Sequence, residues 1–415
     1  MTETTSLAPP VRCLSPTESW YTGLGAYVGY VMEASGHLDV PALSAALQAI
    51  RRAYPVLAAR LRSVAGHQVL VAGDDSPPEV GVRDGDIAEP LAGFDVDPHD
   101  ALSAVHVVRD GDRAAVALVV HHAIADGHHG LAVLEAFWSS YTDIVEGRPA
   151  DLGTRGYPDA VEKILADRGI GDYAYPDPPT GEPAAPAPAD LPAFANRFVR
   201  CDVDTASLLD LGHRAKLTLN ALVSAAIIRA EAAERERSIS EIPYFITVDM
   251  RKRLSPPVET TAGTNVLSFV GFTAAEDTET DLLGLARAVA TRLPEALDEG
   301  TSIRRTAMEI RGFLDHLTGP STPGSVLTSN IGTIPALRSP AGLTLERFRG
   351  SLYNKVQDAS LLSPVRSDST YLYEIYSYRG RTTVEALVGD PAQHESAQRK
   401  IALIESMLTA LPDVG

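Results

Sequence analysis

Hydrophobic positions recur with helical spacing shortly after Asp39. The apolar residues of this pattern, at i, i+3, i+4 and i+7, are Leu43, Ala46, Leu47 and Ile50. Asp39 and Pro41 stand where a helix start favours a capping side chain and a proline. The pattern therefore predicts an amphipathic helix that ends before Tyr54 and Pro55.

Two apolar segments, residues 104–108 and 114–120, flank a turn that contains Asp-Gly, which predicts a β-hairpin. The second strand, AAVALVV, is apolar on both faces and should lie inside a covered sheet. It runs directly into HHAIADGHHG, after which residues 131–141 return to helical spacing. The histidines are therefore expected at the end of a strand, on the turn that precedes a helix.

A segment rich in proline and alanine, residues 173–195, divides the chain and is typical of a semi-rigid linker. We expect an N-terminal domain over residues 1–172 and a C-terminal domain over residues 196–415. Helices are predicted in the second part at 217–234 and 282–297, and strands at 242–251, 371–378 and 382–389; residues 325–329 lead into the segment NIGTIPAL. Helices and strands on both sides of the linker indicate α/β or α+β layers, with a site favoured between the domains.

Composition narrows the classes of partner. A chain of 415 residues exceeds the usual size of one core, which agrees with two domains. The formal charge of −18 argues against nucleic acid or an anionic membrane as the main partner. Cys13 and Cys201 are too few for a disulfide framework or a thiolate metal site, so we expect a reduced, cytoplasmic location. No apolar run is long enough for a transmembrane segment.

The histidine-rich stretch allows three interpretations. A metal site is disfavoured because His121 and His122 are adjacent and would point to opposite faces of a strand. In a purely structural interpretation, His122 is a hydrogen-bonded histidine at a sheet end, and His128 and His129 are solvated. The third interpretation is a general base acting on a hydroxyl or amine. Because no motif offers a covalent nucleophile, a base here favours direct acyl transfer.

Other residues of the stretch fit the general-base interpretation. Gly127 would give the turn conformational freedom and keep side-chain bulk away from the base. Asp126 would pair with an arginine and hold the loop in place.

The stretch contains HHxxxDG, and it resembles the signature of the chloramphenicol-acetyltransferase-like superfamily, which includes condensation domains. Within it, the chain most resembles polyketide-associated acyltransferases of the phthiocerol/phthiodiolone dimycocerosyl transferase type. The similar segments are ILADRGI at 164–170, LTLNALVSAAII at 217–228 and VDMRKRLSPPVETTAGTNVL at 248–267. The resemblance implies an α/β (α+β) fold with two chloramphenicol-acetyltransferase-like domains around a central active-site tunnel. The DFGWG latch of condensation domains is missing, which argues against a peptide-synthetase module.

The resemblance also implies roles for particular residues. His122 matches the family's catalytic base, and Asp126 matches a structural aspartate that pairs with an arginine, for which Arg251 is the candidate. The candidates in the second domain are Thr328 and Asn330 for the oxyanion or substrate, and Arg287 and Arg292 for docking of a carrier protein.

The expected function is that of an O-acyltransferase of lipid biosynthesis. It would move a fatty or polyketide acyl group to an alcohol or diol, and it would need no permanently bound cofactor. The donor would be acyl-CoA or a phosphopantetheine-linked acyl thioester on an acyl carrier protein, for example that of a polyketide synthase. Two alternatives stay open: an amide-forming condensation or release enzyme of peptide or polyketide assembly, and a non-catalytic carrier-docking protein.

Overall fold

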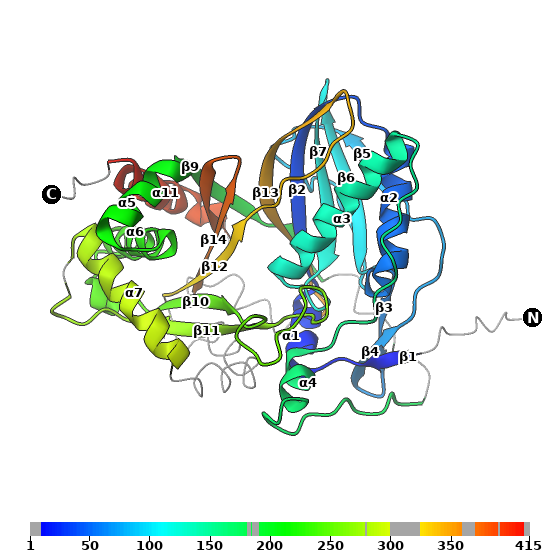
Figure 1. Ribbon diagram of the computed structural model, residues 1–415, viewed down its shortest axis with the longest axis horizontal. Coiled ribbons are helices and arrows are strands. Elements are labelled where there is room, and N and C mark those ends of the chain that lie inside the picture. Colours follow the sequence, from blue (N-terminus) through cyan, green and yellow to red (C-terminus); the bar gives the residue numbers. More distant parts are fainter. Residues whose placement is uncertain are drawn as a thin grey trace, which may run out of the picture. The chain divides into compact units, whose positions relative to one another are not determined.

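A computed structural model describes residues 10–180, 184, 191–278, 280–298, 324–358, 370–388 and 391–410. The chain forms two compact units, each a mixture of helices and strands (Figure 1). The first unit combines residues 1–195, 251–266 and 335–361. The second combines residues 196–250, 267–334 and 362–415. The units are therefore not continuous segments, because two later stretches of the chain pack with the first unit.

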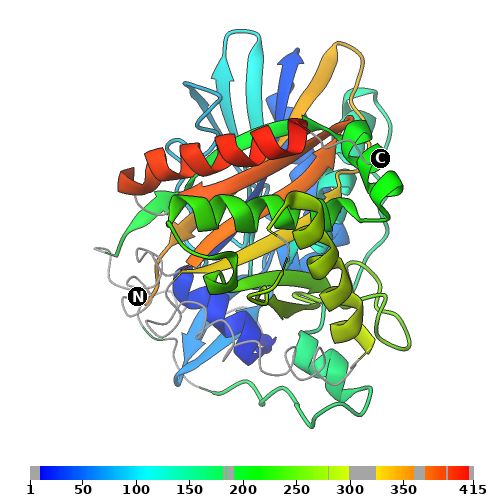
Figure 2. The same cartoon turned by 90° about the vertical axis from the view of Figure 1, so that its left-hand side faces the viewer.

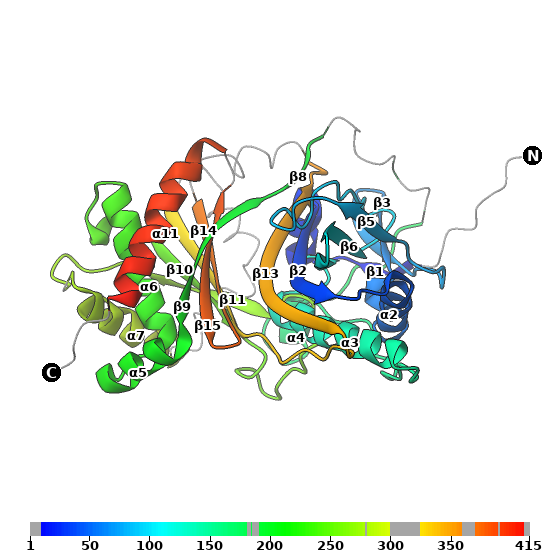
Figure 3. The ribbon, with the colours of Figure 1, turned by 90° about the horizontal axis from the view of Figure 1, so that it is seen from above.

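The first unit is built on a six-stranded sheet. Its strands, in spatial order, are β5 (Val80–Asp84), β6 (Ser103–Asp110), β7 (Arg113–His121), β2 (Ala26–Gly36), β13 (Leu343–Lys355) and β8 (Ala193–Ala195). Strand β13 comes from late in the chain and runs antiparallel beside β2 (Figure 3). Strand β7 lies between β6 and β2, and it is buried along almost its whole length. The predicted hairpin and its interior strand are confirmed.

Two helices, α2 (Val40–Ala53) and α3 (Gly127–Val145), lie side by side in the first unit (Figure 1). The side chain of Asp39 caps α2 by accepting the amide hydrogen of Ala42 at 3.0 Å. The four apolar residues predicted to share one face of this helix are all completely buried. Helix α3 begins at Gly127, earlier than the apolar spacing from Leu131 indicates, because Asp126 caps it.

The first unit also contains a three-stranded sheet of β1 (Pro10–Cys13), β4 (His67–Val71) and β3 (Arg60–Val64). Helix α1 (Pro16–Leu24), the short 3₁₀ helix η1 (Pro55–Leu57) and helix α4 (Val161–Ala166) complete it. Gly25 ends α1 in a left-handed conformation, with φ 54°, and leads directly into β2. A Cβ atom there would lie 1.8 Å from the carbonyl oxygen of Lys355, so the position requires glycine.

The second unit contains another six-stranded sheet. Its strands, in spatial order, are β11 (Leu267–Phe272), β10 (Tyr244–Asp249), β12 (Ser325–Thr333), β14 (Thr370–Tyr378), β15 (Arg381–Val388) and β9 (Arg197–Asp204). Its helices are α5 (Thr205–Ala215), α6 (Leu219–Glu234), η2 (Ile239–Glu241), α7 (Leu282–Asp298), η4 (Pro391–Gln393) and α11 (His394–Thr409). Figure 2 shows α6 and α11 lying across this sheet, and their apolar side chains share one buried cluster with it.

The helices and strands predicted for the second half of the sequence are confirmed. One expected feature differs locally, because residues 193–195 of the proline- and alanine-rich segment form β8, which pairs with β13. Of the helices that the structure describes, none is both long and apolar enough to cross a membrane.

Two glutamates of the second unit stand directly opposite each other, Glu374 on β14 and Glu385 on β15. Glu385 is completely buried, and the Nε atom of Arg200 lies 3.3 Å from its carboxylate. Burial and the neighbouring charge of Glu385 raise the pKa of Glu374 to about 8. The folded protein therefore holds this proton more tightly than the unfolded chain does, and ionisation of Glu374 costs stability.

We expect the free energy of unfolding to fall as the pH rises from about 4.5 to about 8, the ordinary and the raised pKa of Glu374. Glu374→Gln should remove this loss and stabilise the protein at pH 9 by on the order of 3 kcal/mol. Chemical denaturation at pH 5, 7 and 9 measures the effect. Exposed Glu276 provides the matched control, Glu276→Gln, which should keep the wild-type pH dependence. An unchanged pH dependence in Glu374→Gln would contradict the assignment.

Candidate active site

The histidine stretch lies where strand β7 leaves the sheet. The backbone amide of His122 donates to the carbonyl of Ala26 at the start of β2, at 2.7 Å. The carbonyl of His122 accepts a hydrogen bond of 2.8 Å from the side-chain amide of Asn265. Two neighbouring segments therefore hold the backbone of His122, and the position of its side chain is fixed at the strand end.

The two adjacent histidines lie in different surroundings. His121 is completely buried, its ring meets that of Tyr27 edge to face at 4.7 Å, and its Nδ1 accepts the amide hydrogen of Ala123 at 3.1 Å. Burial lowers the pKa of His121 to about 3, with a small further lowering by His122. His121 therefore stays neutral at physiological pH, and its Nδ1 lone pair is occupied.

His122 is only half-buried, and its ring stacks on that of Tyr21. Burial lowers the pKa of His122 below 6.5, and its own backbone carbonyl, the charge of Asp126 and the amide of Asn265 oppose this lowering. The net result is an imidazole that is neutral at pH 7 and partly accessible. Such a group is able to accept a proton from an incoming hydroxyl.

Asp126 and Arg251 form a buried ion pair with two hydrogen bonds. Arg251 Nη1 lies 2.8 Å from one carboxylate oxygen of Asp126, and Nη2 lies 3.0 Å from the other. The same oxygens accept the backbone amides of Val266 and His129, each at 3.0 Å. Burial alone would raise the pKa of Asp126, but the charge and hydrogen bonds of Arg251 outweigh it, and the pKa is lowered. Asp126 is therefore an ionised structural anchor for the turn and the first turn of α3.

The other histidines of the stretch also differ from each other. His128 is half-buried, whereas His129 is 1% exposed and its Nδ1 lies 3.1 Å from the carbonyl of Gly263. The solvated position considered for His129 is therefore wrong, because His129 lies in the first turn of α3 and packs against the segment that contains Arg251. Burial lowers its pKa to about 4. Among the described residues, no three His, Cys, Asp or Glu side chains are grouped to hold a metal ion.

Gly127 and Gly130 differ in what the structure requires of them. Gly127 is the first residue of α3 and does not adopt a left-handed conformation, so the turn does not use its conformational freedom. Gly130 is required by packing, since a Cβ atom there would lie 1.9 Å from the hydroxyl of Tyr30.

Three residues of this site were not identified from the sequence. They are Tyr21 on α1 and the adjacent Thr264 and Asn265, which follow Arg251 in the segment 251–266. The carbonyl of Thr264 accepts the amide of Asp126 at 2.8 Å. Polar residues in an irregular segment give no periodic signal, and the only clue to Thr264 and Asn265 is their position inside the family-like string at 248–267.

The remaining candidates lie in the second unit. Thr328 is 1% exposed and its hydroxyl donates to the carbonyl of Phe245 at 3.0 Å. The side-chain amide of Asn330 donates to Asn220 at 2.9 Å, and its oxygen accepts the amide of Gly332 at 2.9 Å. On α7, Arg287 is exposed and Arg292 is half-buried.

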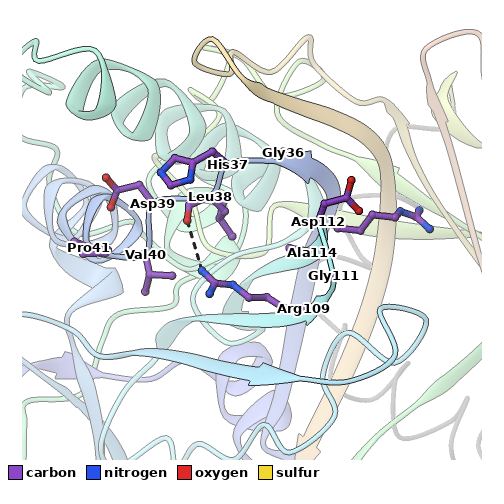
Figure 4. A pocket seen from close by; sticks show the side chains of 11 residues that line it. Gly36, His37, Leu38, Asp39, Val40, Pro41, Arg109, Gly111, Asp112 and Ala114 are labelled. Atoms are coloured by element: carbon purple, nitrogen blue, oxygen red, sulfur yellow. Dashed lines mark hydrogen bonds between the residues drawn. The ribbon is translucent and has the colours of Figure 1, made fainter.

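A cavity of about 620 Å³ opens at the other end of β7. Its walls are residues 36–41, which connect β2 to α2, together with Arg109 and residues 111–114 of the β6–β7 hairpin (Figure 4). Arg109 donates to the carbonyl of Leu38 at 3.5 Å across this cavity. Because each strand residue advances about 3.3 Å, the cavity lies about 25 Å from His122 and is separate from the histidine site.

Comparisons with known sequences agree on one family. Residues 196–387 match the family model described as phthiocerol/phthiodiolone dimycocerosyl transferase C-terminus. The phthiocerol/phthiodiolone dimycocerosyl transferase of Mycobacterium tuberculosis is 30% identical over 97% of both chains. The enzyme of the same name from Mycobacterium leprae is 29% identical, again over 97% of both chains.

Solved structures share the fold of this chain. Polyketide synthase associated protein 5 from Mycobacterium tuberculosis superposes with a TM-score of 0.80 at 28% identity, covering 97% of this chain and 99% of that one. The trichothecene 15-O-acetyltransferase from Fusarium sporotrichioides shares the fold, with a TM-score of 0.62 at 12% identity over 97% and 99% of the two chains. The first condensation domain of the calcium-dependent antibiotic synthetase does so too, with a TM-score of 0.59 at 14% identity over 97% and 100%. The chain therefore belongs to the phthiocerol/phthiodiolone dimycocerosyl transferase family, and it is an acyltransferase.

Proposed function

We propose that this acyltransferase moves a fatty or polyketide acyl group from a thioester to an alcohol or diol, with His122 as general base. The observation that carries the proposal is the contrast within the histidine stretch. His122 is partly accessible and neutral, whereas His121 and His129 are buried. The carboxylate of Asp126 is engaged in its ion pair with Arg251. His122 is thus the group of this stretch best suited to receive a proton from substrate.

In the proposed reaction, the imidazole of His122 takes the proton of the acceptor hydroxyl as its oxygen attacks the thioester carbonyl. The tetrahedral intermediate then collapses, the carbon–sulfur bond breaks, and the imidazolium returns the proton to the departing thiolate. Every proton and electron pair is accounted for by the two substrates and one side chain. Neither a metal ion nor a covalent enzyme intermediate is needed for this sequence of steps.

The donor and the oxyanion contacts are assigned by similarity to the family. We propose acyl-CoA or an acyl group on a carrier protein as donor, with Arg287 and Arg292 of α7 as the docking residues for the carrier. Arg287 is exposed on α7, as a docking residue must be. A role for Thr328 or Asn330 at the oxyanion requires each of them to exchange its present hydrogen-bond partner. A cytoplasmic location is part of the same proposal.

Mass spectrometry of products tests the proposed function. The purified protein is offered a mixture of acyl-CoA thioesters together with simple alcohols, diols and amines. We expect esters that depend on the protein, with free thiol released in equal amount. A preference for amide products would support the amide-forming alternative instead. Binding of an acyl carrier protein without any product would identify the protein as a docking module and would refute the proposal.

A further inference from the structure

A tyrosine ring covers one face of the imidazole of His122. The rings of Tyr21 and His122 are nearly parallel, at 10°, and their centroids are 4.0 Å apart. Tyr21 is 6% exposed, so this contact is well inside the first unit. Aromatic rings usually pair at 4.5 to 7 Å, and a separation this small means that the two rings lie in direct face-to-face contact.

The carboxylate of Asp126 is not available to orient His122. In a serine-type triad, an aspartate holds the histidine ring in place through a hydrogen bond. Here both oxygens of Asp126 already accept two hydrogen bonds each, from Arg251, Val266 and His129. The main chain of His122 is held by Ala26 and Asn265, and its ring also interacts with its own backbone carbonyl and with Asn265. The stacked ring of Tyr21 adds a contact over one face of the imidazole.

Helix α1 is anchored firmly enough to serve this purpose. Glu18 forms a capping box with Ser15, and both of its oxygens lie 2.7 Å from the guanidinium of Arg12. The hydroxyl of Thr264, which precedes Asn265, also donates to Glu18 at 2.9 Å. Glu18 and Tyr21 are three residues apart and therefore share one face of the helix.

A second contact holds the start of the same helix. Glu162 of α4 accepts hydrogen bonds from both the amide and the hydroxyl of Thr17, at 2.9 and 2.6 Å. Two buried carboxylates thus fix α1 against α4 and against the segment 251–266. Tyr21 therefore lies on a helix whose position is fixed. A residue that positions another side chain needs such a fixed position.

We propose that Tyr21 is a positioning residue that fixes the plane of the His122 imidazole by ring stacking. The proposal rests on the role of His122 as base given above. The aromatic ring performs this task and the phenol hydroxyl does not take part. A phenylalanine at this position should therefore work as well as tyrosine, whereas an aliphatic side chain of similar bulk should not.

Two substitutions and one spectroscopic signal test the proposal. We expect Tyr21→Leu to lower kcat by about ten- to a hundredfold with little change in KM, because a ring free to rotate is seldom in the reactive orientation. Tyr21→Phe should stay within about twofold of the wild type, because the stacked ring is kept. Phe94→Leu, which removes a half-buried aromatic ring elsewhere in the first unit, is the matched control and should leave kcat unchanged.

The signal is the Cε1–H resonance of His122, identified by its loss in His122→Ala. Stacking should shift it upfield in the wild type and in Tyr21→Phe, and the shift should disappear in Tyr21→Leu. Absence of the upfield shift in the wild type would overturn the proposal even if Tyr21→Leu failed to fold. Equal loss of kcat in the Phe and Leu variants would also overturn it, because the hydroxyl would then be the active part. Full activity of His122→Ala would instead refute the base, and the resonance would still report on stacking.

Discussion

His122→Ala is expected to fold normally and to lose acyl transfer by about two to four orders of magnitude, the usual contribution of a general acid–base residue. The side chain is half-buried at the end of β7, and its backbone contacts to Ala26 and Asn265 do not depend on the imidazole. The substitution therefore removes the base and leaves the strand end intact. Free thiol released from a medium-chain acyl-CoA in the presence of an alcohol or diol, above background hydrolysis, measures the loss.

The half-buried His128 of the same stretch gives the matched control, since His128→Ala removes an imidazole that stands close in sequence to the base. It should retain wild-type turnover. The pH profile provides an independent check, because the lowered pKa of His122 places the acidic limb of kcat/KM below the ordinary histidine value of 6.5. Turnover of His122→Ala at the wild-type rate would eliminate His122 as the base.

Local patterns in the sequence are strong wherever one face of an element is buried. The spacing of Leu43, Leu47 and Ile50 identifies α2, and the uninterrupted apolar run before His121 identifies the interior strand β7. Because β7 ends where polar residues begin, the place of His122 at a strand end follows from hydrophobicity alone. Strand β7, at whose end the proposed base lies, could thus be predicted from the sequence.

The contacts around His122, in contrast, could not be predicted from patterns in the sequence. The stack of Tyr21 on His122 joins residues about one hundred positions apart, and no periodicity within α1 indicates which partner its aromatic ring meets. The linker composition likewise gives no sign that residues 251–266 and 335–361 pack with the first unit. Because residues 251–266 pack with the first unit, Arg251 forms an ion pair with Asp126 and Asn265 donates a hydrogen bond to the carbonyl of His122. The pairing of Asp126 with Arg251 was suggested only by similarity to the family.

Asp126→Ala is expected to lower the free energy of unfolding by about 3 to 5 kcal/mol, the usual cost of leaving one member of a buried ion pair alone. Arg251 is 3% exposed, and the substitution removes the carboxylate that accepts two hydrogen bonds from its guanidinium. The helix cap on α3 would be lost as well, at about 1 kcal/mol. Chemical denaturation measures the loss, and activity should fall with it because the turn carrying His122 loses its anchor.

A double-mutant cycle separates the ion pair from the other contacts of each residue. Arg251→Ala should also be destabilising, whereas Asp126→Ala combined with Arg251→Ala should cost less than the sum of the two, by a coupling of about 1 to 3 kcal/mol. Asp126→Asn is the conservative variant, because its side-chain oxygen still caps the amide of His129 while the charge is removed. If Asp126→Ala kept the wild-type stability but lost activity, Asp126 would act directly in the reaction. An ionised carboxylate held by four hydrogen bonds is poorly suited to such a role, so we expect stability and activity to fall together.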